Sequence, residues 1–263
     1  MKKAYVLVLF MALLAVPGLG QDEADLAKQT QNPVSDLISV PFQNNTNFGI
    51  GPGDDTQNVL NIQPVWPFKL NERWNLITRT IVPVISQPSV LTGNDSEFGV
   101  GDINFSAFFS PAKPGKWIWG IGPSLLFPTA TDNALGTEQW GAGPTAVLLT
   151  MNGPWVYGGL INQIWSYAGD NDRADVSQLL LQPFVNYNMP DGWYLVSAPV
   201  ITANWEASSD STWTVPMGGG IGKIFKIGKQ PVNASLQGYY NIEKPRMGAD
   251  WTLRAQLQLL FPK

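Results

Sequence analysis

Most of the chain after residue 36 alternates apolar and polar residues with a period of two. The clearest case is the run 251–261, whose apolar and polar side chains fall on opposite faces of an extended chain. One face carries Trp251, Leu253, Ala255, Leu257, Leu259 and Phe261, and the other carries Thr252, Arg254, Gln256 and Gln258. A helix would scatter both sets around its circumference, so this pattern predicts a strand. The runs 102–110, 178–188 and 232–241 alternate in the same way.

Twelve runs of this kind follow one another, each about 11–14 residues long. They cover 37–49, 56–67, 73–85, 99–111, 116–128, 139–151, 155–168, 176–188, 192–205, 212–226, 229–242 and 250–262. Strands of soluble sheets average about 5–6 residues, whereas a tilted strand that crosses a bilayer needs about 9–11. The lengths and the even number predict an all-β fold, a transmembrane antiparallel up-and-down β-barrel of about twelve strands over residues 37–263.

The connections between these runs alternate between short and long. The short ones are 69–72, 112–115, 152–154, 190–192 and 228–230, and the longer, acidic ones include 86–98, 129–138 and 169–175. Outer-membrane barrels have short periplasmic turns and longer extracellular loops, whereas a soluble sandwich has no reason to sort its loops by parity. We therefore expect the short turns in the periplasm and the long segments outside the cell.

The tryptophans lie near the ends of the predicted strands, and none lies at mid-strand. Those near short turns are Trp66, Trp74, Trp117, Trp119, Trp155 and Trp193, and those near long segments are Trp140, Trp165, Trp205, Trp213 and Trp251. Two aromatic belts at the water–lipid boundaries would produce this distribution. The alternative is a soluble barrel with core tryptophans, which would prefer the strand middles.

Prolines interrupt many of the predicted strands. The set comprises Pro64, Pro83, Pro123, Pro144, Pro183, Pro199 and Pro216. Proline has no N–H to donate to a strand ladder, so a central strand usually excludes it. Because bulges tolerate proline and are frequent in barrels, we expect local bulges at these positions.

The N-terminus has the three parts of a secretory signal peptide. Lys2 and Lys3 precede the apolar run 4–16, Pro17 ends this run, and small residues precede Gln21. About 13 apolar residues are too few for a retained membrane helix, which needs about 20. We predict cleavage after residue 20, Sec-dependent export and insertion into the outer membrane of a Gram-negative-type bacterium. Residues 21–36 can form a short helix in the periplasm or plug the barrel.

The composition excludes several kinds of chemistry. The chain has no Cys and no His, which removes disulfides, Cys- or His-ligated zinc and the Ser-His-Asp triad. Its net charge of −4 argues against nucleic-acid binding. The spacing of Asp170, Asp172 and Asp175 could suit Ca²⁺, but the glycine and final glutamate of an EF-hand are missing, which favours a solvated loop. We expect a protein that is not an enzyme and that uses no cofactor and no metal.

The polar faces of the strands should line the lumen if the apolar faces contact lipid. The candidate pore-lining residues are Arg79, Asp102, Gln178, Gln182, Phe184, Asn186, Gln237, Tyr239, Arg254 and Gln256. A charged side chain facing lipid at mid-depth would cost about 2–4 kcal/mol, so Arg79 and Arg254 should point inward. They could either brace a hydrogen-bonded network that fills a narrow barrel or form a positive constriction that selects solutes.

Several short runs carry a family resemblance that covers nearly the whole mature chain. They are QNPVSDLISVP (31–41), PVWP (64–67), WNLITRT (74–80), GDI (101–103), QPFVNY (182–187) and LLFPK (259–263). These runs resemble the "MetA pathway of phenol degradation" outer-membrane transporter family, whose members are sometimes mislabelled neuromedin U. The resemblance implies an outer-membrane barrel that takes up aromatic or other small hydrophobic compounds.

These observations predict a porin-like channel or transporter for small molecules. Its expected partners are outer-membrane lipid and lipopolysaccharide, the barrel-assembly machinery and a small-molecule solute, without nucleic acid. A non-conducting structural or surface-adhesion barrel with a lumen closed by side chains is the main alternative. A barrel enzyme that modifies lipids or cleaves proteins is disfavoured because the chain has no histidine.

Overall fold

The computed structural model describes residues 20–93 and 95–262. The predicted signal peptide, residues 1–20, lies outside the described residues apart from Gly20, with which helix α1 (Gly20–Thr30) begins. No helix in the described part of the chain is both long and apolar enough to cross a membrane.

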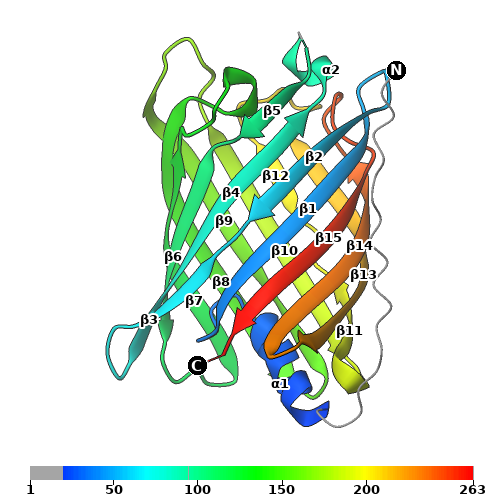
Figure 1. The fold of residues 1–263 in the computed structure, drawn as a ribbon. Coiled ribbons are helices and arrows are strands. Elements are labelled where there is room, and N and C mark those ends of the chain that lie inside the picture. The colour runs from blue at the N-terminus through cyan, green and yellow to red at the C-terminus, as the bar shows by residue number, and fades with distance from the viewer. Residues whose placement is uncertain (1–19, 94, 263) are drawn as a thin grey trace.

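The described residues form a closed antiparallel β-barrel of twelve wall strands, which confirms the predicted fold class (Figure 1). Nine wall strands are single elements: β1 (Ile38–Ile50), β4 (Trp74–Gln87), β7 (Trp117–Phe127), β8 (Gln139–Asn152), β9 (Trp155–Gly169), β10 (Ser177–Asn188), β13 (Trp213–Ile227), β14 (Gln230–Glu243) and β15 (Trp251–Phe261). The other three are β2 (Asp55–Ile62) with β3 (Val65–Lys69), β5 (Glu97–Val100) with β6 (Ile103–Pro111), and β11 (Trp193–Ser197) with β12 (Ile201–Asn204). Antiparallel pairing of β1 with β15, from Ile38 opposite Phe261 to Phe48 opposite Trp251, closes the barrel.

The connections separate by length to the two ends of the barrel. The short turns after β3, β6, β8, β10 and β13 lie at the same end as α1, and the turn after β10 contains the 3-10 helix η2 (Pro190–Gly192). The opposite end carries the longer segments, which contain helix α2 (Ser89–Thr92) and the 3-10 helix η1 (Asn133–Leu135) (Figure 1). This arrangement agrees with the parity of connection lengths in the sequence; which end faces the periplasm stays a prediction.

The outer wall of the barrel is apolar at mid-height. Ile121, Leu148, Ile161, Leu195 and Leu236 are each between 46% and 54% exposed. An aqueous surface rarely exposes so large a contiguous apolar area, whereas a lipid-facing band requires it. The exterior is therefore that of a membrane-spanning barrel.

Most tryptophans also lie on the outside. Exposed examples near the short-turn end are Trp66, Trp74, Trp117 and Trp155, and those near the long-segment end are Trp140, Trp165, Trp205, Trp213 and Trp251. Trp119 and Trp193 are half-buried near the short turns, and Lys223 Nζ lies 4.7 Å from the centroid of the Trp193 ring. The two aromatic belts at the lipid boundaries stay a prediction.

The prolines coincide with interruptions in the strand ladders. Pro64 separates β2 from β3, and Pro199 separates β11 from β12. Pro83 lies opposite the break between β5 and β6, because β4 pairs with β6 up to Ile81 and with β5 from Val84. A proline opposite a break requires no N–H donor on that side, which is why the strand tolerates it.

A second group of prolines follows the same rule. Pro183 lies opposite the break between β11 and β12. Pro123 and Pro144 are partners in the β7–β8 ladder, and each faces an irregularity in the ladder on its other side. Pro216 lies at a register shift between β13 and β14. Only Pro216 lies at a bulge as expected. The other six prolines lie at or opposite breaks in the strand pairing.

Candidate functional site

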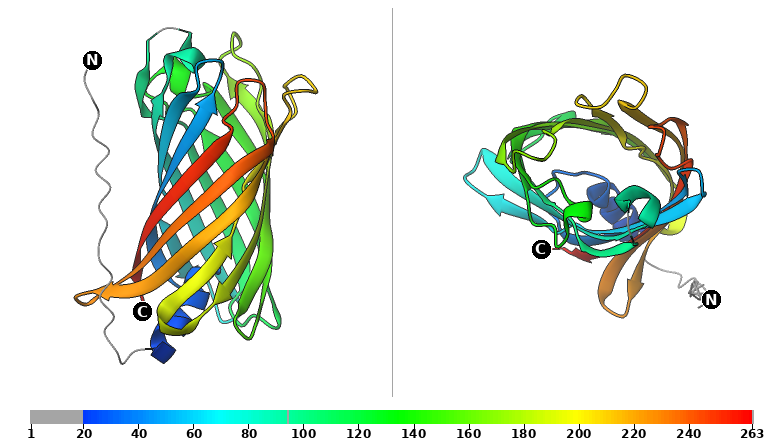
Figure 2. Two further views of the ribbon diagram at one scale, coloured as in Figure 1. Left: turned by 90° about the vertical axis from the view of Figure 1, so that its right-hand side faces the viewer. Right: turned by 90° about the horizontal axis from the view of Figure 1, so that it is seen from above.

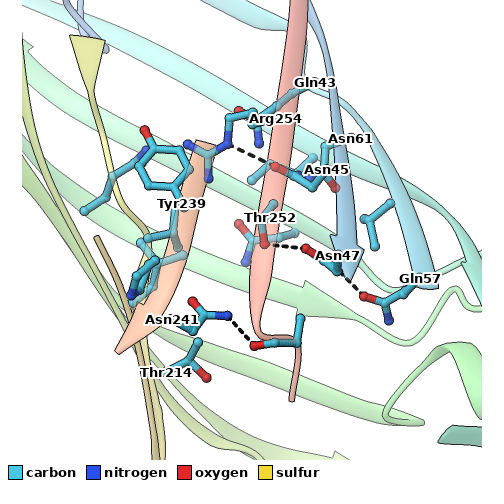
Figure 3. Close-up of a pocket in the computed structure, with 18 of the residues that line it drawn as sticks. Gln43, Asn45, Asn47, Gln57, Asn61, Thr214, Tyr239, Asn241, Thr252 and Arg254 are labelled. Atoms are coloured by element: carbon cyan, nitrogen blue, oxygen red, sulfur yellow. Dashed lines mark hydrogen bonds between the residues drawn. The ribbon is translucent and has the colours of Figure 1, made fainter. Parts of the chain in front are cut away.

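A large cavity of about 630 Å³ extends down the lumen from the long-segment end. Its wall is rich in amides because the inward positions of neighbouring strands carry Asn or Gln. These residues are Gln43, Asn45 and Asn47 on β1, Gln57 and Asn61 on β2, Asn104 on β6, Asn162 on β9, Gln182 on β10 and Asn241 on β14. Several of them are labelled in Figure 3. The lumen near this end is therefore a polar chamber inside an apolar exterior.

The side chains of this chamber hydrogen-bond to one another along the wall. Thr252 Oγ1 donates to Asn47 Oδ1 at 2.7 Å, and Asn47 Nδ2 donates to Gln57 Oε1 at 2.8 Å (Figure 3). Gln57 in turn donates through Nε2 to Gln87 Oε1. Such a network fixes the amide groups against the wall and leaves the centre of the chamber to a solute or water.

A smaller cavity of about 200 Å³ lies below the chamber, toward the short-turn end. Thr30, Gln31 and Pro33 of the N-terminal segment contribute to its lining, together with polar residues of β10, β14 and β15. The two cavities share six lining residues, Gln43, Gln63, Arg79, Leu160, Gln182 and Arg254. We call this ring the waist, because it lies where the outer chamber meets the inner cavity.

Arg254 is held in the waist by contacts in several directions. Its Nε donates to Asn45 Oδ1 at 3.0 Å, and its Nη1 donates to the carbonyl oxygen of Ala198 at 2.9 Å. Its guanidinium carbon lies 4.8 Å from the centroid of the Tyr239 ring, a cation–π contact (Figure 3). The residue is 7% exposed. Arg254 is therefore a buried charge in a fixed orientation.

Arg79 enters the waist from β4. Its Nη2 donates to Gln63 Oε1 at 2.8 Å. Arg79 and Arg254 both line the two cavities, so two positive charges share the waist. The partners recorded for both guanidiniums are neutral, so the waist carries a concentrated positive potential.

Part of the barrel interior is apolar. The sequence pattern predicted apolar strand faces only on the lipid side. Toward the short-turn end, Ile77, Phe108, Val147, Leu149 and Val156 form a buried apolar cluster together with Leu160. Val34, from the N-terminal segment, packs into this cluster. The segment therefore enters the barrel and covers one inner wall, which is why that wall is apolar.

Helix α1 docks in the lower mouth of the barrel. Ala27 packs against Leu37, Tyr194, Ile224 and Leu260. Gln31 and Asn188 exchange two side-chain hydrogen bonds, of 2.8 and 3.0 Å. Seen from above, the helix lies within the outline of the barrel wall (Figure 2, right). The contacts of Ala27 and Gln31 place this part of the segment at the lower mouth, and a plug role for residues 21–36 stays a prediction.

The structure brings most of the candidate pore-lining residues to the two cavities. Tyr239 lines the outer chamber, while Arg79, Gln182 and Arg254 line both cavities. Phe184, Asn186, Gln237 and Gln256 line the inner cavity. Gln178 lies higher, in a surface depression among the long segments that also contains Thr137 and Asn204.

Asp102 borders neither cavity, contrary to its place among the candidates. Its carboxylate accepts hydrogen bonds from the backbone N–H groups of Thr129, Ala130 and Thr137, at 3.1, 3.2 and 2.6 Å, and from the Thr137 hydroxyl at 2.7 Å. It sits at the break between β5 and β6, where the wall strand is interrupted. The carboxylate therefore anchors the 129–138 segment over the barrel mouth.

Sequence reasoning missed the lumen residues of β1 to β3. Gln43, Asn45, Asn61 and Gln63 all line the chamber or the waist. The stretch 43–47 reads Gln-Asn-Asn-Thr-Asn, polar on both faces, so the period of two does not reveal which face points inward. The high density of Asn and Gln in this stretch was the feature of the sequence that could have indicated a lumen wall.

No family model matches the chain, and no curated protein matches its sequence. Among solved structures it is similar to the COG4313 outer membrane channel from Pseudomonas putida F1, with a TM-score of 0.65 and 19% identity over 86% of this chain and 94% of that one. Outer membrane phospholipase A from Escherichia coli gives a TM-score of 0.46 at 14% identity, covering 92% of this chain and 98% of the other. The CymD monoaromatic hydrocarbon channel gives 0.49 at 10% identity, with 93% of each chain covered. At these identities the first likeness establishes the fold, which is that of an outer-membrane β-barrel.

Proposed function

We propose that this protein is an outer-membrane channel or transporter that carries small molecules through its lumen. The observation that carries the proposal is the chamber of about 630 Å³, which reaches from the long-segment end to the waist. A barrel that served only as a structural element would fill this volume with side chains. The predicted export signal and the apolar exterior support a position in the outer membrane.

The composition of the chamber supports a solute with both polar and apolar parts. Amides form much of its wall, and Ile81, Phe108, Leu160 and Leu180 add apolar surface. Such a wall can bind a small aromatic or aliphatic molecule and still hydrogen-bond to its polar group. This agrees with the uptake of small hydrophobic compounds that the family resemblance implies.

The structure also favours a second candidate, a non-conducting structural barrel. The N-terminal segment covers the lower part of the lumen through Val34 and the Gln31–Asn188 pair, and the inner cavity there is only about 200 Å³. An enzyme is disfavoured, because histidine-dependent hydrolysis cannot occur in a chain without histidine.

Single-channel conductance of the refolded protein in planar bilayers separates the two candidates. We expect discrete conductance steps that change when a small aromatic solute is added. The variant Gln182→Trp should reduce the conductance, because Gln182 lines the waist. The neighbouring Leu181→Trp is the matched control, since alternation along β10 turns Leu181 to the opposite face.

Heat-modifiable mobility in gels reports whether each variant has folded. A folded wild-type protein without conductance would refute the channel and leave the structural barrel. Equal conductance in Gln182→Trp and Leu181→Trp would show that the solute path does not pass the waist.

A further inference from the structure

The charge on the cavity walls is opposite in sign to that of the protein as a whole. The chain has 20 acidic and 16 basic residues, a net charge of −4. Among the described side chains that line the chamber and the inner cavity, Arg79 and Arg254 are the charged ones, and no Asp, Glu or Lys accompanies them. An acidic protein thus encloses a lumen whose fixed charge is positive.

The carboxylates of this protein lie elsewhere. Among the described residues, the ion pairs join Lys69 to Glu72, Arg173 to Glu138, and Lys244 to Asp250, all at the two ends of the barrel. Neither lumen arginine takes part in one. Proteins usually pair an enclosed charge, because an uncompensated one is costly when removed from water. The waist keeps two such charges near each other without an acidic side chain.

Neutral contacts hold the two arginines in place but do not cancel their charge. Asn45, the Ala198 carbonyl and the Tyr239 ring orient Arg254, and Gln63 orients Arg79. A guanidinium held this way needs little reorganisation to receive an anion, and its planar donors match the geometry of a carboxylate. The two oriented guanidiniums are therefore suited to bind an anion.

We infer that the waist is a binding site for the carboxylate of a small organic acid, held between Arg79 and Arg254. This inference rests on the proposed transport function and names its substrate class. The carboxylate would bring a negative charge to a ring that carries two positive ones, and the amide groups of Gln43, Gln63 and Gln182 border the same ring.

The apolar wall distinguishes an organic acid from an inorganic anion. Leu160 belongs to the waist itself, and Leu180 and Ile81 line the chamber directly above it. An organic acid can place its carboxylate on the arginines and its hydrocarbon part against these side chains. Inorganic phosphate could bind to the two arginines, but it would make no contact with the apolar side chains of the wall. A neutral hydrocarbon could contact the apolar side chains, but it would leave the two positive charges without a counter-charge.

The test compares benzoate with benzamide, which have the same ring and nearly the same shape but differ in charge. Binding to the refolded full-length mature protein in detergent is measured by titration calorimetry. We expect benzoate to bind at least about tenfold more tightly than benzamide and than inorganic phosphate. In planar bilayers, the reversal potential is measured under a salt gradient. Its sign should be the one that shows a preference for anions over cations.

Charge variants connect the effect to the waist. The double variant Arg79→Gln/Arg254→Gln should lose benzoate affinity by about tenfold or more and lose anion selectivity, while benzamide binding stays unchanged. The double variant Arg79→Lys/Arg254→Lys should keep the selectivity, because it keeps the charge. Lys223→Gln is the matched control, since Lys223 lies over the Trp193 ring and lines neither cavity.

The outcomes distinguish this inference from the proposed function. Conductance without a preference for benzoate over benzamide would refute the acid site and leave the channel. Benzoate binding that depends on the arginines in a protein without conductance would support the site and refute the channel. Phosphate binding as tight as benzoate would overturn the organic-acid assignment. Should the double Gln variant fail to fold, equal affinity of the wild-type protein for benzoate and benzamide still refutes the site.

Discussion

Arg254 of β15 and Ala198, three wall strands away, are joined inside the lumen by a hydrogen bond of 2.9 Å from the guanidinium Nη1 to the backbone carbonyl oxygen. Ala198 lies in the break between β11 and β12, where the ladder does not satisfy its backbone groups. Its N–H donates to the hydroxyl of Tyr239 at 2.9 Å. Two lumen side chains, Arg254 of the waist and Tyr239 of the chamber, therefore satisfy the backbone groups that strand pairing leaves open at this break.

The hydroxyl of Tyr239 should contribute measurably to stability. It accepts from the Ala198 N–H and donates to Gln237 Oε1 at 2.6 Å. Tyr239→Phe leaves both partners without this hydroxyl, so we expect the free energy of unfolding to fall by about 1–3 kcal/mol. Urea unfolding of the refolded protein in lipid vesicles, followed by tryptophan fluorescence, measures the change. Tyr240→Phe, with a ring 61% exposed on the outer face, is the control and should be close to neutral.

Gly122 should not tolerate a side chain. A Cβ at this position would overlap the carbonyl oxygen of Ala107, because β6 and β7 approach closely beside Pro123. Gly122→Ala is therefore expected to lower the unfolding free energy by about 1–3 kcal/mol or to reduce the refolding yield. Gly238→Ala is the control, since a Cβ there meets no atom within 4 Å. Equal urea midpoints for the two variants would contradict the close approach.

The two ends of the barrel should differ in their accessibility from outside the cell. Asn152 is the last residue of β8, beside the tight turn into β9, and Asp95 lies in the long segment between β4 and β5. We expect a membrane-impermeant maleimide to label Asp95→Cys in intact cells and to label Asn152→Cys only after the outer membrane is opened. The chain has no native cysteine, so the label reports the introduced one. Labelling of Asn152→Cys alone in intact cells would reverse the orientation.

Removal of residues 21–35 should widen the path through the lower lumen. This segment contributes Gln31 and Pro33 to the inner cavity and Val34 to the apolar cluster. We expect a larger single-channel conductance together with a lower urea midpoint, because Ile77 and Phe108 lose a packing partner. Unchanged conductance in the folded variant would show that the segment does not limit the path.

The strands and the order in which they pair follow from local patterns in the amino-acid sequence. Alternation with a period of two is a local property, since successive side chains of an extended chain point to opposite faces. The run 251–261 therefore predicts β15 almost to the residue, and the length of the runs predicts a membrane barrel of about twelve strands. The alternation of short and long connections can also be predicted from the sequence. In an antiparallel meander every second connection lies at the same end of the sheet, so each end collects connections of one kind.

The contents of the lumen depend on contacts between residues that are distant in the sequence. Alternation assigns a residue to a face, but it does not say which residues of distant strands meet at one height, because strand tilt and register set that height. Arg79 and Arg254, 175 positions apart, meet in the waist through the closure of β1 on β15. The inward wall of Ile77 and Phe108 is apolar for a related reason: Val34, from a segment outside the strand pattern, packs against it only after the barrel has closed.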